Sequence, residues 1–244
     1  MPPDPPQWPP EDAVVHEIHD RYLLEVVEAM NLCPFSRKSR EAGLVQRPIF
    51  REVPSREDVE VACELLVETV RATPLVEIML LTCPIPAGHP WTDSKRFDQF
   101  MTSLRDTFSA REGLPTFYMV SFHPSPPRVA ESVRSPHQLI PLIRRTPDPV
   151  IQCVRAETLD EVRRQAQLVH DARVRERVLE ESPELVSLLD RCVTTDPEIS
   201  SDIAEANFRA MSKERARAHL DETITDIQAE RHRRYGDVRK SPAT

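Results

Sequence analysis

The sequence predicts an α/β protein in which helices flank a small mixed or parallel sheet, with a helical segment at the C-terminal end. Three observations carry this prediction. Apolar residues recur at helical spacing near the start of the chain, helical and extended segments alternate up to about residue 155, and charged helical sequence continues to about Tyr235. Alternating helices and strands are typical of sheets built with right-handed crossovers.

The first helix is predicted over residues 12–30, where apolar positions repeat every three or four residues. Residues 45–53 follow as a strand. They include Pro48, which has no N–H to give to a neighbouring strand, so we expect this strand at an edge of the sheet. A helix over residues 55–70 then presents an apolar face that contains Cys63, which we interpret as a core residue.

Residues 75–82 form a near-continuous apolar run, which is typical of a strand buried on both faces. A helix over residues 93–110 and a strand over residues 116–122 come next. A short helix is predicted from Ser135 to Arg145, and residues 150–155 are predicted as a fourth strand. This order places the ends of the second and third strands at one edge, where ligands gather in such sheets.

The chain divides into three predicted parts. Residues 1–11 hold six prolines and are expected to be a disordered leader. Residues 12–212 are predicted to form a single α/β domain, and residues 213–244 a charged helical tail suited to self-association.

The composition narrows the class of protein. A net charge of −8 lacks the basic footprint of a nucleic-acid binder. No apolar run has the length of a membrane span and no secretory signal opens the chain, so we expect a cytoplasmic protein that does not associate with membranes. The five cysteines form no Cys-x-x-Cys pair, which fits a reducing compartment. Only four glycines occur, and no phosphate-binding loop motif is present.

Cys33 is the first candidate functional residue. Pro34 follows it and Gly43 lies nine residues further on, the usual punctuation of a short helix, which predicts Cys33 at the N-cap. A thiol there faces unpaired N–H groups, so it should have a lowered pKa and be suited to attack an electrophile or bind a soft metal. The alternative is a small buried side chain at a helix–loop junction.

Further candidates lie in loops and at helix ends. His123 follows the third strand, at the edge where Cys83 follows the second, and Arg134 and Arg144 flank the predicted short helix. Each also has a plain structural reading, as a hydrogen-bonded strand end or as a helix cap. His16 and His19 lie three apart on the first helix. We interpret them as a solvated pair rather than a metal site, because no third ligand is evident.

Three motifs together resemble a bacterial domain-of-unknown-function family: Asn31-Leu32-Cys33-Pro34-Phe35, Ser121-Phe122-His123-Pro124 and Arg134-Ser135-Pro136. The family's later helix, with Ile and Asn four apart, is matched by Ile203 and Asn207. The resemblance covers about residues 12–212. The Cys-Pro-Phe element alone is similar to that of YqcI/YcgG-type proteins, some of which are heme-dependent oxygenases, and this similarity implies heme as a cofactor.

Three functions follow as hypotheses. The first is a heme-thiolate oxidoreductase, possessing an iron-ligating Cys33 and acting on a small carboxylate-bearing substrate. Its catalytic residues are Cys33 and His123. Its cofactor-binding residues are Cys33, Phe35, His123, Arg134 and Arg144, and its substrate-binding residues are Arg134, Ser135 and Asn207. The second is a cofactor-free enzyme with Cys33 as nucleophile and His123 as proton shuttle. The third is a non-catalytic protein that senses heme or redox state. Both catalytic readings predict that Cys33 and His123 share one pocket.

Overall fold

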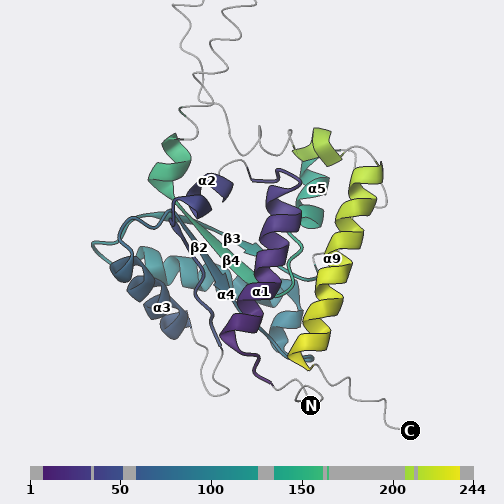
Figure 1. Ribbon diagram of the computed structural model, residues 1–244. Helices are drawn as coiled ribbons and strands as arrows, with labels where there is room; N and C mark the ends of the chain where they lie inside the picture. The colour runs from purple at the N-terminus through teal and green to yellow at the C-terminus, as the bar shows by residue number, and fades with distance from the viewer. Residues whose placement is uncertain are drawn as a thin grey trace, which may run out of the picture.

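The strands form a four-stranded mixed sheet, as the sequence predicts (Figure 1). The computed structural model describes residues 8–33, 36–51, 59–125, 135–161, 164, 207–211 and 214–236. Within these residues the sheet order is β1-β2-β4-β3. The strands are β1 (Val45–Gln46), β2 (Ile78–Thr82), β3 (Phe117–Phe122) and β4 (Val150–Arg155). As expected from Pro48, β1 is an edge strand, and a single bridge between Ile49 and Thr82 continues it.

The fourth strand runs opposite to the other three. β1 pairs with β2 in parallel, whereas β4 pairs antiparallel with both β2 and β3. The connection from β3 to β4 begins and ends at the same edge of the sheet, where the His123 N–H donates to the Arg144 carbonyl oxygen over 3.0 Å. Since this connection returns to the edge from which it left, β4 enters between β2 and β3 in the reverse direction.

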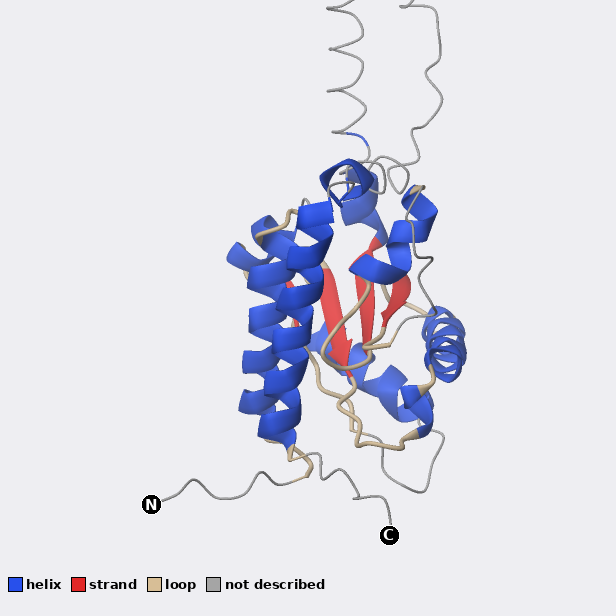
Figure 2. Ribbon diagram, turned by 90° about the vertical axis from the view of Figure 1, so that its right-hand side faces the viewer, coloured by secondary structure: helices blue, strands red, loops and turns tan. Residues whose placement is uncertain are grey.

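Helices cover both faces of the sheet. α3 (Val59–Ala72) and α4 (Ser94–Ser109) pack on one face. A short 3-10 turn, η2 (Pro90–Thr92), immediately precedes α4. Figure 2 shows the opposite layer, in which the N-terminal helix and the long C-terminal helix α9 (Glu214–Tyr235) lie side by side. α2 (Ser36–Glu41) and α5 (Pro136–Ile143) complete this layer. No helix among the described residues is both long and apolar enough to cross a membrane.

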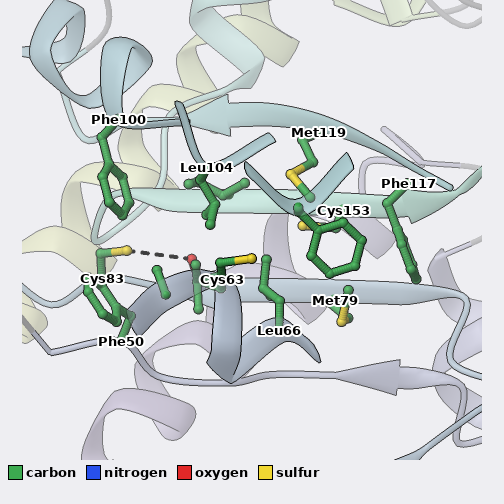
Figure 3. Close-up of a cluster of buried hydrophobic side chains, with 14 of the residues drawn as sticks. Phe50, Cys63, Leu66, Met79, Cys83, Phe100, Leu104, Phe117, Met119 and Cys153 are labelled. Carbon is green, nitrogen blue, oxygen red and sulfur yellow. Dashed lines mark hydrogen bonds between the residues drawn. The ribbon is translucent and has the colours of Figure 1, made fainter. Parts of the chain in front are cut away.

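The face covered by α3 and α4 is an apolar core. Figure 3 shows its sulfur-rich centre, to which Cys63, Cys83 and Cys153 contribute thiols. Cys63 is fully buried, which confirms its interpretation as a core residue. Burial raises the pKa of Cys63 and raises that of Cys153 to about 12. These two thiols are therefore protonated and inert at neutral pH.

The N-terminal helix changes its winding halfway along. The sequence predicts one regular helix over residues 12–30, but the structure has an α-helix, α1 (Asp12–Arg21), followed by a π-helix, η1 (Tyr22–Glu28). A π-helix advances less per residue and is wider than an α-helix, and such segments are frequent at functional sites. This change from α-helix to π-helix alters which side chains of the N-terminal helix face the sheet.

The C-terminal helix forms a second apolar core together with the N-terminal helix. α9 ends at Tyr235, as the sequence predicts, and its apolar side chains are buried against α1 and η1. Leu220, Ile224, Ile227 and Tyr235 are each at most 1% exposed. The predicted leader falls mostly outside the described residues, although the Trp8 ring lies 6.4 Å from that of Tyr235. Residues predicted as a tail thus help to bury the N-terminal helix.

Candidate functional site

A cavity of about 250 Å³ lies between the N-terminal helix and the sheet. It is formed on the sheet face opposite to α3 and α4, because successive residues of a strand point to opposite faces. Ile78, Leu80 and Thr82 of β2 face the cavity, while Met79 and Leu81 between them belong to the other core. The remaining apolar walls come from Leu23, Val27, Leu32, Val45, Phe122, Ile143, Val150 and Val154.

The π-helix decides which helical residues reach this cavity. His16, His19 and Tyr22 line it at intervals of three residues, and from Leu23 the intervals lengthen to four at Val27 and five at Leu32. This spacing suits the wider turn of a π-helix better than a uniform α-helix. Val26 is instead buried in the contact with α9.

A Schellman motif ends η1 and delivers Cys33 to the cavity. Asn31 has a φ of 52°, the left-handed conformation that Asn tolerates better than other side chains. The Leu32 N–H donates to the Val27 carbonyl oxygen over 2.9 Å, and the Asn31 N–H to that of Glu28 over 3.2 Å. This turn buries Leu32 and leaves Cys33 half-buried in the cavity wall. Pro34 lies outside the described residues, so the predicted position of Cys33 at the N-cap of the following helix stays a prediction.

Asn207 supports this turn from a distant part of the chain. Its side-chain amide is buried and donates to the Leu32 carbonyl oxygen over 3.1 Å. Asn207 also lines the cavity. The structure therefore brings Cys33 and Asn207 together and shows that Asn207 bonds to the backbone next to Cys33.

Arg144 places a positive charge in this apolar cavity. Its guanidinium carbon lies 5.8 Å from the centre of the Phe122 ring, and both side chains line the cavity. Burial lowers the pKa of Arg144, and the more distant Asp98 opposes this shift. Within the described part of the chain, Arg144 forms no ion pair, whereas its neighbour Arg145 pairs with Asp221. An unpaired guanidinium at an apolar wall is suited to bind a carboxylate.

Two residues of the cavity wall, Tyr22 and Ser36, carry buried hydroxyls. The hydroxyl oxygens of Tyr22 and Ser36 are fully buried and have no hydrogen-bond partner among the described residues. Burial raises the pKa of Tyr22, Arg145 opposes part of the rise, and Cys33 adds to it. The phenol is therefore protonated and lies within electrostatic range of the Cys33 thiol.

His123 does not join Cys33, and the prediction that they share one pocket is wrong. The neighbouring Phe122 faces the cavity, so His123 faces the other core, where its ring lies 6.1 Å from that of Phe97. Its Nε2 bonds to the Trp91 carbonyl oxygen over 2.8 Å, and its Nδ1 is engaged by the backbone of Ser125. The alternation of side chains along β3 already indicates this separation, because neighbouring residues of a strand point to opposite faces of the sheet. The prediction of a shared pocket took into account only the edge at which the strands end.

His16 and His19 are not a solvated pair. The Nε2 atom of His16 bonds to the Arg47 carbonyl oxygen, and that of buried His19 bonds to Asp148 over 3.1 Å. Both rings also line the cavity. In the described residues, no group of three or more His, Cys, Asp and Glu side chains is arranged to hold a metal ion.

Asp148 is fully buried and anchors the helical layer to the sheet. It accepts hydrogen bonds from His19, from Arg231 over 2.9 Å and from Tyr235 over 2.8 Å. Burial acts to raise the pKa of Asp148, but the bond from His19 and the charge of Arg231 hold it below its usual value. The carboxylate is thus ionised and paired, as a buried charge must be.

The remaining predicted residues do not reach the cavity or are not described. Ser135 precedes α5 and makes no side-chain cap, and it does not line the cavity. Phe35, Arg134 and Ile203 lie outside the described residues. Tyr22 and Ser36 were missed by the sequence analysis. Tyr22 lies within the helical repeat of apolar residues over 12–30, and Ser36 directly follows the Cys-Pro-Phe element.

These features define an α/β protein with a largely apolar cavity whose wall includes the thiol residue Cys33 and the guanidinium residue Arg144. The chain belongs to the family described as Protein of unknown function (DUF1415), whose model matches residues 14–187. This finding confirms the expected membership of a family of unknown function. No curated protein and no solved structure matches the chain. Function must therefore be argued from the site itself.

Proposed function

We propose that this protein is a cofactor-free thiol enzyme in which Cys33 attacks a small, largely apolar substrate that carries a carboxylate. One observation carries the proposal: Cys33 lines the same apolar cavity as Arg144, whose guanidinium has no ion-pair partner among the described residues. Binding of the substrate carboxylate to Arg144 holds the substrate in one orientation relative to Cys33, and such positioning is a large part of catalysis.

The size of the cavity supports a small substrate. An apolar protein cavity of about 150 Å³ accommodates benzene. By proportion, 250 Å³ suits a ligand of roughly ten non-hydrogen atoms. Because most of the walls are aliphatic, a hydrocarbon chain or ring between the carboxylate and the reactive carbon fits best.

Heme, the cofactor expected from the Cys-Pro-Phe element, fits this arrangement poorly. His123 is expected to bind the same heme as Cys33. Its ring nitrogens are instead engaged by backbone groups, on the sheet face that points away from the cavity. The cavity is also smaller than the roughly 300–1,000 Å³ typical of pockets for drug-sized ligands, and a porphyrin is a large ligand of this kind. The size of the cavity favours a cofactor-free enzyme, but one without the predicted proton shuttle, because His123 does not line the cavity.

Protection of Cys33 from alkylation tests the proposal. Iodoacetamide labelling of the Cys33 peptide is followed by mass spectrometry, with and without octanoate. We expect octanoate to slow the labelling, and the neutral octanamide to need at least about tenfold higher concentration, because a charge-assisted bond to Arg144 is lost.

Two arginine variants make this test specific. Arg144→Gln should abolish the preference for octanoate over octanamide, while Arg145→Gln should keep it, because Arg145 is paired with Asp221. Equal protection by both compounds in the unmodified protein, or an unchanged preference in Arg144→Gln, contradicts the proposed substrate class.

A second candidate, a binding protein without turnover, is favoured by one observation. Both histidines of the cavity use their Nε2 atoms for bonds to protein groups, so neither offers that nitrogen as a base. The two candidates differ in the reactivity of the thiol. A nucleophile should be alkylated far faster than a free cysteine at pH 7, and a purely structural thiol more slowly.

A further inference from the structure

The two edges of the sheet are protected differently. β1, at one edge, is two residues long, and Arg47 and Pro48 follow it directly. β3, at the other edge, runs over six residues, Phe117–Phe122, none of which is charged or a proline. Proteins commonly protect edge strands by keeping them short or by placing charges and prolines on them, because an unprotected edge pairs readily with another strand. The composition of β3 is that of a strand with a partner on both sides, yet among the described residues it pairs with β4 alone.

The outer edge of β3 presents the main-chain groups of alternate residues. The Ala156 N–H donates to the Thr116 carbonyl oxygen over 2.9 Å, so Thr116 belongs to a pair that is hydrogen-bonded toward the β4 side. Such pairs alternate along an antiparallel ladder, and the N–H and C=O groups of Phe117, Met119 and Ser121 therefore point away from β4. None of the other described segments exchanges a backbone hydrogen bond with these three residues.

Helix α4 lies along this edge and runs in the opposite direction to β3. The Phe108 ring lies 5.9 Å from the Phe117 ring, and the Asp98 carboxylate accepts a hydrogen bond from the Ser121 hydroxyl. The beginning of α4 thus lies beside the end of β3, and the end of α4 lies beside the beginning of β3. The middle of this contact on α4 therefore lies above Met119, the residue midway between Phe117 and Ser121.

α4 carries opposite charges on the two sides of that middle. Asp98 and Arg105 are both exposed, and because they are seven residues apart, about two helical turns, they share one face of the helix. Arg105 bonds to its neighbour Asp106, but both side chains are exposed and such a contact contributes little. A two-fold axis through the middle of the contact exchanges its two sides. It brings Asp98 of each copy toward Arg105 of the other.

We propose that two copies of this chain form a dimer through β3, with the two strands antiparallel about a two-fold axis at Met119. Phe117 of each copy pairs with Ser121 of the other, and Met119 pairs with its own counterpart, so the two sheets become one. The two α4 helices then lie side by side across the axis, with Asp98 facing Arg105 at both ends. This dimer does not depend on the proposed function, because the cavity lies on the sheet face away from α4.

Two charge variants test the pairing across the axis. Asp98→Arg places two positive charges at each end of the interface, and Arg105→Asp places two negative charges there. Each variant alone should dimerise at least about tenfold more weakly than the unmodified protein in sedimentation equilibrium, because like charges then face each other. An equimolar mixture of the two variants should form a heterodimer, since both ends of the interface again pair opposite charges.

The chain offers matched controls for these variants. Arg96→Asp makes the same change in charge as Arg105→Asp, but nine residues away, on the opposite side of α4, and it should leave the affinity of the dimer unchanged. Ser121→Pro removes an outward N–H without removing a bond to β4, so it should give a monomer. Ser121→Ala loses only the hydroxyl and should remain dimeric.

Amide hydrogen exchange, followed residue by residue, supplies an independent readout. In the dimer the N–H groups of Phe117, Met119 and Ser121 are hydrogen-bonded to the other copy, so their exchange should slow as the protein concentration rises through the micromolar range. The N–H groups of Val120 and Phe122 bond to β4 within one chain, and their exchange should not depend on concentration.

Three results overturn the dimer. The first is an unmodified protein with the mass of a single chain throughout the micromolar range. The second is a dimer that persists in Ser121→Pro and in both charge variants, because it uses another surface, such as the C-terminal segment predicted to mediate self-association. The third is a loss of dimer in each charge variant with no recovery in their mixture, since the substitutions then act within one chain and not across the axis.

Discussion

The side-chain amide of Asn207 donates a hydrogen bond of 3.1 Å to the main-chain carbonyl oxygen of Leu32, 175 residues earlier in the chain. Leu32 immediately precedes Cys33, so the bond fixes the turn on which the candidate nucleophile is placed. Asn207 also lies beyond residues 14–187, the part of the chain that matches the family model. A segment outside the family match therefore helps to build the site.

Replacing Asn207 should loosen the Cys33 turn. Asn207→Ala leaves the buried Leu32 carbonyl without this donor, and we expect a loss of about 1–3 kcal/mol in the free energy of unfolding. Octanoate should also protect Cys33 less well, because the thiol and Arg144 are no longer held in one geometry. Urea unfolding and the alkylation assay measure the two effects. Ala210→Gln, at an exposed position of the same helical segment, should change neither.

The left-handed backbone at Asn31 predicts an unusual order of substitutions. Asn31→Gly should be nearly neutral, while Asn31→Ala should lower the free energy of unfolding by about 1–2 kcal/mol, because an alanine Cβ disfavours a φ of 52°. In a regular helix the order is the reverse, since Ala is the better helix former there. If thermal melts rank Ala above Gly, the Schellman motif does not end this helix.

Asp148 should make a large contribution to stability that is lost in acid. Its pKa is lowered in the folded protein, so the contribution is complete above the ordinary value of 3.8 and disappears as the pH falls through the lower folded value. Asp148→Asn should cost about 3–5 kcal/mol at neutral pH, because it leaves Arg231 as a buried charge without its carboxylate.

The pH dependence of unfolding separates this effect from simple loss of packing. Between pH 4 and pH 2, the unmodified protein should lose stability more steeply than Asp148→Asn, since the variant lacks the titrating carboxylate. Asp221→Asn serves as the control, because Asp221 is an exposed partner of Arg145 and should contribute about 0–1 kcal/mol. Parallel acid profiles for the unmodified protein and Asp148→Asn rule out the ionised, paired state described above.

The C-terminal helix should unfold together with the sheet. Ile224→Ala on the buried side of α9 should lower the free energy of unfolding by about 2–5 kcal/mol, since it creates a cavity against the N-terminal helix. Glu222→Ala on the exposed side should change it by no more than about 0.5 kcal/mol. Near-equal values for the two variants, or a separate early transition seen by circular dichroism, indicate that α9 is an independent tail.

Local sequence was sufficient for the elements whose structure depends on their own residues. The apolar run of β2 is buried on both faces, as predicted, because each face meets a helical layer. α4 begins directly after Asp93, whose side chain accepts the Lys95 N–H over 3.0 Å, so a short-range cap marks its start. The edge position of β1 and the end of α9 near Tyr235 follow from the same kind of signal.

By itself, then, the sequence determined the fold class, the order of the elements, the importance of the Cys33 turn and the membership of a family of unknown function. Only the tertiary structure decided that β4 runs antiparallel to its neighbours, that His123 faces away from Cys33, and that the Tyr22 and Ser36 hydroxyls have no hydrogen-bond partner among the described residues. Periodicity and capping are local and can be read from a few neighbouring residues. The direction of a strand, the face of a ring and the partner of a buried hydroxyl depend on residues far apart in the chain, which only folding brings into contact.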